Sequence, residues 1–80
     1  MSNAVIYTKA TCPWCVKAKE ILSSKGISYT EHLVGSAEVP NREALQEAVG
    51  RPVTTVPQII LDGVYVGGCT DLAAKLGVQL

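Results

Sequence analysis

Apolar residues in the first part of the chain follow two different spacings. Residues 4–8 form a short apolar run with β-branched side chains, which predicts a buried strand. Over residues 13–25 the spacing becomes helical, because Cys15, Ala18 and Leu22 recur on one face. The pattern therefore predicts a strand, a short loop and a helix, in that order.

The middle of the chain predicts a second strand and a second helix. Gly26 closes the first helix, and residues 27–33 alternate apolar with polar side chains. Asn41 is a suitable N-cap for a helix over Arg42–Val49, which Gly50 ends. Two strands joined by a helix form a β-α-β unit, whose crossover makes the strands parallel.

The last part of the chain contains the clearest turn signal. Asp62-Gly63 separates the apolar runs Gln58–Leu61 and 64–66, and Asp-Gly is typical of a two-residue hairpin turn. Gly67-Gly68 predicts a tight turn, and residues 71–76 a short helix. The order β-α-β-α-β-β-α then predicts an α/β fold, with a four-stranded mixed sheet flanked by three helices.

Composition narrows the class of protein. The 80 residues are 48% hydrophobic and 18% charged, which favours one folded domain over residues 1–80 and disfavours disorder. Seven basic residues balance seven acidic ones, so bulk charge does not favour binding to nucleic acid or to membranes. The sequence shows no signal peptide and no apolar run of membrane-spanning length. We therefore expect a cytoplasmic monomer whose ligand is held by a local site.

The cysteines carry the candidate chemistry. Three cysteines are too few, and odd in number, for a secreted disulfide scaffold. Cys12-Pro13-Trp14-Cys15 lies where the first loop becomes a helix, and Pro13 suits the first helical turn. Cys12 then lies at the helix N-terminus, which stabilises a thiolate, and Lys9 adds positive charge nearby. Cys15 lies one turn further in, on the apolar face, so we expect Cys12 to attack and Cys15 to resolve.

Half of a zinc site is the alternative interpretation of this spacing. A single C-x2-C does not separate redox from metal chemistry. A second C-x2-C is absent, and only Cys69 and His32 remain to complete four ligands. The β-α-β context therefore favours a redox pair, with no metal expected.

Two further segments have the character of a ligand site. Thr55-Val56-Pro57 precedes a strand, where proline either marks an edge or follows a cis peptide that leaves the Val56 backbone free for a peptide-like ligand. The segment from Gly67 to Asp71 is a glycine turn that opens a helix, so its N–H groups can receive a carboxylate. Asp71 either caps that helix or receives an α-ammonium.

With these residues in place, the chain resembles a dithiol glutaredoxin over nearly its whole length. The matching segments are Ile6-Tyr7-Thr8-Lys9 before the Cys12–Cys15 motif, then Thr55-Val56-Pro57-Gln58, then Gly67-Gly68-Cys69-Thr70-Asp71. The resemblance implies a thioredoxin-like fold and glutathione as the reductant. One departure is Trp14, which stands where dithiol glutaredoxins usually carry tyrosine; we expect it to contact glutathione.

The resemblance also implies how glutathione is held. Thr55, Val56 and a cis Pro57 would line its cysteinyl part. Thr70 and Asp71, with the adjoining Gly68 and Cys69, would hold its γ-glutamyl end. Lys9 would approach the glycine carboxylate, assisted by Arg51. Cys69 is otherwise expected to be a small, partly buried apolar residue.

The implied function is reduction of protein disulfides and glutathione mixed disulfides. Cys12 attacks, and either Cys15 or a second glutathione resolves the intermediate. Two alternatives stay open: an iron–sulfur module, against which Pro13 argues, and an electron donor reduced by a flavoprotein, against which the Gly67 to Asp71 segment argues. Ribonucleotide reductase is a target within the family, and no residue of the chain singles it out.

Overall fold

The computed structural model describes residues 3–53 and 55–79, and its elements follow the predicted order. They are β1 (Asn3–Thr8), α1 (Pro13–Ser24), β2 (Ser28–Leu33), α2 (Arg42–Val49), β3 (Gln58–Leu61), β4 (Val64–Gly67) and α3 (Cys69–Leu76). The strands form one sheet in the order β2-β1-β3-β4. β1 is parallel to β2 and antiparallel to β3, and β3 is antiparallel to β4, so the predicted mixed sheet is confirmed.

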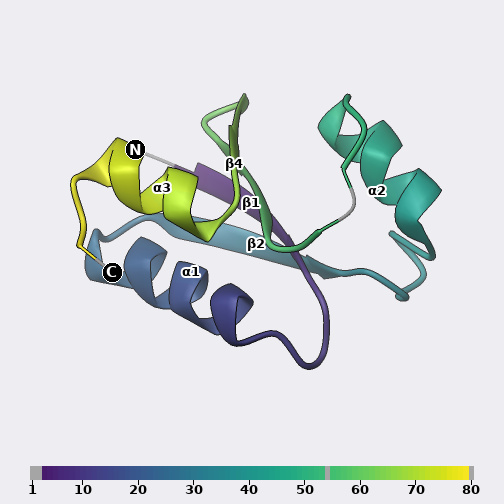
Figure 1. Ribbon diagram of the computed structural model, residues 1–80, viewed down its shortest axis with the longest axis horizontal. Helices are drawn as coiled ribbons and strands as arrows, with labels where there is room; N and C mark the ends of the chain where they lie inside the picture. The colour runs from purple at the N-terminus through teal and green to yellow at the C-terminus, as the bar shows by residue number, and fades with distance from the viewer. Residues whose placement is uncertain (1–2, 54, 80) are drawn as a thin grey trace.

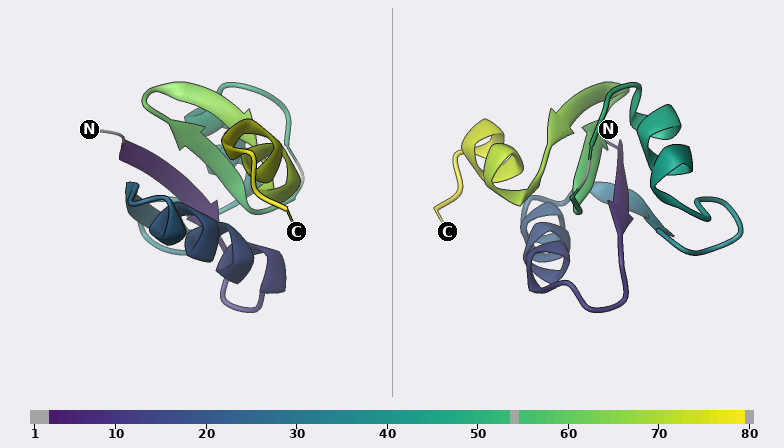
Figure 2. Two further views of the ribbon diagram at one scale, coloured as in Figure 1. Left: turned by 90° about the vertical axis from the view of Figure 1, so that its left-hand side faces the viewer. Right: turned by 45° about the vertical axis from the view of Figure 1, so that its right-hand side comes forward.

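Helices cover both faces of the sheet. α1 and α3 lie together on one face, and α2 lies on the other (Figures 1 and 2). The alternation of strand side chains explains the two layers, since successive residues point to opposite faces. On β1, Ile6 belongs to the core under α1 and α3, whereas Tyr7 belongs to the core under α2. On β3, Ile59 and Ile60 divide between the two cores in the same way.

The hairpin and the last helix show how local sequence sets the ends of elements. Asp62 and Gly63 both have positive φ, 51° and 81°, as a two-residue turn of this type requires. α3 begins at Cys69, two residues earlier than predicted. The reason is that Gly68 is the N-cap and Asp71 lies in the first turn, where its carboxylate accepts the Gly68 N–H. The predicted Gly67-Gly68 turn is correspondingly shorter, because β4 continues to Gly67.

β2 forms one residue shorter than predicted, from Ser28, and its apolar side chains are largely exposed. Tyr29 and Leu33 are exposed, while His32 is half-buried and stacks on Tyr7 with ring centroids 5.5 Å apart. The physical reason is position, because β2 is an edge strand and neither core extends beneath its full width.

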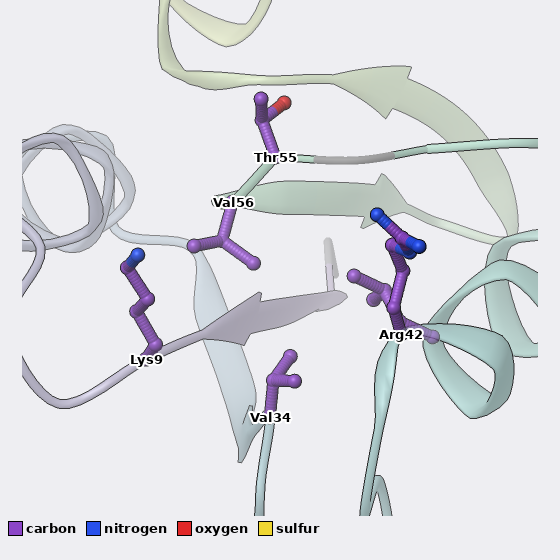
Figure 3. Close-up of a pocket in the computed structure, with 6 residues that line it drawn as sticks. Lys9, Val34, Arg42, Thr55 and Val56 are labelled. Atoms are coloured by element: carbon purple, nitrogen blue, oxygen red, sulfur yellow. The ribbon is translucent and has the colours of Figure 1, made fainter.

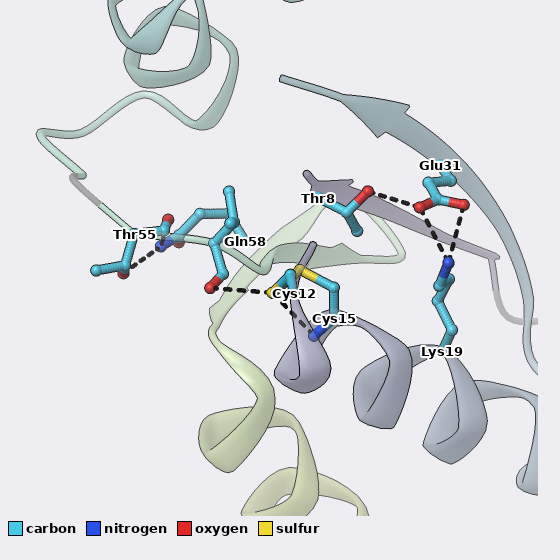
Figure 4. Close-up of a disulfide and its surroundings, with 8 residues drawn as sticks. Thr8, Cys12, Cys15, Lys19, Glu31, Thr55 and Gln58 are labelled. Carbon is cyan, nitrogen blue, oxygen red and sulfur yellow. Dashed lines mark hydrogen bonds and ion pairs between the residues drawn. A yellow bond between two sulfur atoms is a disulfide. The ribbon is translucent and has the colours of Figure 1, made fainter. Parts of the chain in front are cut away.

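A polar link joins β1, β2 and α1 next to the cysteines (Figure 4). The buried Thr8 hydroxyl donates to Glu31 Oε2 at 2.6 Å, and Lys19 Nζ lies 3.1 Å from the same oxygen. The hydrogen bond from Thr8 is the main cause that lowers the pKa of Glu31; partial burial opposes it and Lys19 adds to it. The link fixes the end of β1, from which the loop to Cys12 departs.

Candidate active site

The two cysteines lie at the start of α1 in unequal surroundings. Cys12 is the N-cap, with extended backbone, and its Sγ accepts a hydrogen bond from the Cys15 N–H at 3.1 Å. The Cα atoms lie 5.2 Å apart, and the two residues form a disulfide (Figure 4). Cys15 is 2% exposed and packs in the apolar stripe, whereas Cys12 is partly exposed. This arrangement suits an attacking thiol at Cys12 and a shielded partner at Cys15.

The first turn of α1 can stabilise a negative charge on Cys12. A helix N-terminus presents free N–H groups and the positive end of the helix dipole. The Cys15 N–H already points at the Cys12 sulfur, so a thiolate there gains a charge-assisted hydrogen bond. Both effects favour a thiolate over a thiol at this position, which suits a nucleophile.

The loop before β3 lies against the same sulfur atom. The peptide bond between Val56 and Pro57 is cis, as predicted. The Val56 carbonyl oxygen lies 3.9 Å from Cys12 Sγ. Thr55 is exposed and Val56 is half-buried, so their backbone forms one wall beside the cysteine pair.

A hollow of about 220 Å³ opens on this wall. Residues from α1, from the loop before β3 and from the start of α3 line it: Trp14, Thr55, Val56, Pro57, Gly68, Cys69 and Thr70. Seven of the predicted glutathione-binding residues thus meet in one place, from three segments far apart in sequence. Trp14 is 52% exposed, so its indole has a free face for a ligand.

Asp71 lies beside this hollow and is held in a defined position. Its Oδ2 accepts the Gly68 N–H at 3.0 Å. Gly67 has φ of 121°, and a Cβ there would lie 2.5 Å from Asp71 Oδ2. The carboxylate therefore occupies the space that any side chain at residue 67 would need.

We expect Gly67→Ala to destabilise the protein by about 1–3 kcal/mol, because alanine is strained at this φ and displaces Asp71. Urea unfolding measures the loss. In an Asp71→Ala background the contact with the carboxylate is gone, so the same glycine substitution should cost less. An equal cost in both backgrounds would show that backbone strain alone is responsible.

A second hollow, of about 280 Å³, continues from Thr55 and Val56 on the side away from α3. Its other lining residues are Lys9, Val34, Arg42 and Leu45. Lys9 and Arg42 lie on opposite sides of Val34 and Val56 (Figure 3). An apolar floor between two cations suits a ligand that ends in a carboxylate.

Arg42 was not among the residues predicted for the site. One weak signal was present in the sequence, because a cation in the first turn of a helix interacts unfavourably with the helix dipole. Arg51, predicted to assist Lys9, lies elsewhere. Its guanidinium stacks over the Tyr65 ring, 4.0 Å from the centroid, and it lines neither hollow.

Cys69 is buried at 4% exposure, and its thiol is not paired with another cysteine. Burial raises the pKa of the Cys69 thiol, and Lys17 only partly opposes this. Cys69 is therefore a poor nucleophile near neutral pH, which agrees with the apolar role expected for it.

Over residues 3–53 and 55–79, no cluster of His, Cys, Asp or Glu could hold a metal ion, and no helix is long and apolar enough to cross a membrane.

Comparisons with known proteins agree with this geometry. The family model described as glutaredoxin matches residues 4–66. Glutaredoxin 3 of Escherichia coli strain K12 is 50% identical over 74 residues, which are 92% of this chain and 86% of that protein. The solved structure of E. coli glutaredoxin has a TM-score of 0.73 at 33% identity and covers 92% of both chains. A buckwheat glutaredoxin–glutathione complex shares the fold, with a TM-score of 0.77 at 23% identity over 95% of this chain and 69% of that chain.

A thioredoxin-like fold with a disulfide-forming cysteine pair at a helix N-terminus defines a thiol–disulfide oxidoreductase. Within that class, the chain belongs to the glutaredoxin family.

Proposed function

We propose that the protein is a glutathione-dependent oxidoreductase that reduces protein disulfides and glutathione mixed disulfides. One observation carries the proposal. The two hollows share Thr55 and Val56, with Lys9 and Arg42 at one end and Asp71 beside the other, and Cys12 lies at the wall between them. Glutathione has a matching order of groups: a glycine carboxylate, a central thiol, and a γ-glutamyl end with an α-ammonium.

In this assignment each end of glutathione meets complementary charge. Lys9 and Arg42 bind the glycine carboxylate. Asp71 accepts a hydrogen bond from the α-ammonium, and the N-terminus of α3 at Thr70 receives the α-carboxylate. Trp14 covers the ligand from the side of α1.

The reaction is two successive thiol–disulfide exchanges. On a glutathionylated protein, the Cys12 thiolate attacks the glutathione sulfur; the Cys12–glutathione disulfide forms and the protein leaves as a thiolate. A second glutathione thiolate then attacks the bound glutathione sulfur, which yields oxidised glutathione and regenerates the Cys12 thiolate.

Reduction of a protein disulfide uses both cysteines of the pair. Cys12 forms a mixed disulfide with the protein, and Cys15 attacks the Cys12 sulfur, which releases the reduced protein and leaves the Cys12–Cys15 disulfide. Two glutathiones then reduce that disulfide. We propose that this chemistry operates in the cytoplasm, where glutathione is kept reduced. Ribonucleotide reductase is one protein disulfide that the family resemblance suggests as a substrate.

Turnover of a glutathionylated peptide, coupled to NADPH-dependent recycling of glutathione, tests the proposal directly. We expect the rate to saturate with the glutathionylated peptide and to depend on the glutathione concentration, as for a second substrate. Turnover with a flavoprotein reductase and none with glutathione would overturn it.

We expect Asp71→Asn to raise the KM for the glutathionylated peptide by roughly 10–100-fold, since a charge-assisted hydrogen bond is worth about 1.5–3 kcal/mol. The amide still offers an oxygen to the Gly68 N–H, so the helix cap survives while the charge is lost. Alkylation of Cys12 by iodoacetamide should be unchanged. An Asp71→Asn variant with the parent KM would show that this carboxylate does not bind the ligand.

A further inference from the structure

Gln58 is a buried polar residue that the exchange chemistry does not use. It begins β3, is 5% exposed, and its side chain faces the core under α2, away from Ile59. Burying an amide is unfavourable unless each of its polar atoms finds a partner. The hydrogen-bond partners of the Gln58 amide therefore indicate what the residue does.

Both ends of the Gln58 amide are hydrogen-bonded. Nε2 donates to the Thr55 carbonyl oxygen at 2.8 Å and lies 3.5 Å from Thr55 Oγ1 (Figure 4). Oε1 accepts from the Tyr65 hydroxyl. A carbonyl oxygen can only accept, so the amide nitrogen faces Thr55, and Oε1 is left to accept the Tyr65 hydroxyl, which holds the amide in that orientation. The Arg51 guanidinium stacked on the Tyr65 ring restrains that ring in turn.

Thr55 is the residue that both hollows share with Val56. A displaced Thr55 carbonyl would carry with it the peptide unit of Val56, whose own carbonyl oxygen faces the Cys12 sulfur. We propose that Gln58 is a positioning residue for glutathione: its buried amide, oriented by Tyr65, holds the Thr55-Val56 backbone in the position that binds the ligand. This inference rests on the proposed function and adds a group that does not touch glutathione.

Gln58→Glu is the sharpest test because it is nearly isosteric. One oxygen of the introduced carboxylate still accepts the Tyr65 hydroxyl, but the other faces the Thr55 carbonyl oxygen and repels it. Burial raises the pKa of a carboxyl at this position, so the defect is measured at a pH of about 8, where the carboxylate forms. The KM for a glutathionylated peptide should rise about tenfold there, with the rate of Cys12 alkylation unchanged.

Acid should reverse the defect. When the introduced carboxyl takes up a proton, its O–H can donate to the Thr55 carbonyl as the amide did. The KM ratio of variant to parent should therefore fall toward one as the pH is lowered from about 8 to about 5. The other titratable groups near Gln58 are Tyr65 with Arg51 on its ring, and Tyr7, which pairs with Gln58 in register and stacks on His32. All four are present in both proteins, so the ratio removes their own titration.

Two further variants complete the experiment. Tyr65→Phe removes the donor that orients the amide and should raise the KM about threefold with no pH reversal. Ile59→Val is the matched control, because it removes a buried methyl from the same strand on the opposite face and leaves both hydrogen bonds intact. Its KM should equal that of the parent.

The possible results separate the two claims. If the parent turns over glutathionylated peptide, and Gln58→Glu and Tyr65→Phe both keep the parent KM across the pH range, the inference is wrong and the proposed function stands. If one of these two variants does not fold, the KM of the other variant decides. If the parent itself does not use glutathione, the proposed function fails and the inference fails with it.

Discussion

Cys12→Ser is expected to abolish turnover of both glutathionylated and disulfide substrates, a loss on the order of 10³-fold or more. Cys12 is the partly exposed member of the pair, and it receives the Cys15 N–H at its sulfur. A serine hydroxyl is not ionised near neutral pH, even at a helix N-terminus. The other two thiols are buried, so neither can replace Cys12 as the nucleophile.

The pH dependence of alkylation checks the assignment independently of turnover. In the reduced parent, the thiol that reacts first should be Cys12, identified by mass spectrometry, and its reaction should persist well below the free cysteine pKa of about 8.5. A thermal melt like that of the parent shows that Cys12→Ser remains folded. Residual turnover in that variant, or faster alkylation of Cys15 than of Cys12, would reverse the roles of the two cysteines.

The fold was largely predictable because its local signals agree with one another. The Asp62-Gly63 turn, the Asn41 cap and the Gly50 stop each specify an element end, and the structure has all three. The apolar spacing also identified the buried Cys15 correctly. The exposure of Tyr29 and Leu33 on β2 could not be predicted, because alternation in a sequence does not reveal that a strand lies at the edge of a sheet.

The site was predictable only as far as its residues lie in recognisable segments. The cysteine motif, the segment at Pro57 and the segment ending at Asp71 each have a local reason to bind or react. Arg42 has only the weak signal of a cation in the first turn of a helix. Gln58 lies in a segment that matches the family, but its residue type and position in a strand indicate no role. Packing of α2 next to the loop before β3 brings Arg42 to the site. Gln58 reaches Thr55 from three residues further along the chain, and Tyr65 of β4 bonds the other end of its amide.

Cys15→Ser is expected to separate the two activities. Reduction of protein disulfides should fall by on the order of 100-fold or more, because the Cys12–protein mixed disulfide then has no thiol one turn away to resolve it. Turnover of glutathionylated peptide should stay within about threefold of the parent, since a second glutathione performs that step from solution.

The substitution leaves the ligand site unchanged, because serine is similar in size to cysteine and the buried Cys15 lines neither hollow. The measurement is the ratio of the two rates on matched substrates, one a peptide–glutathione disulfide and one an intramolecular peptide disulfide. Equal losses on both substrates would mean that Cys15 supports the site as a packed core residue and does not act as the resolving thiol.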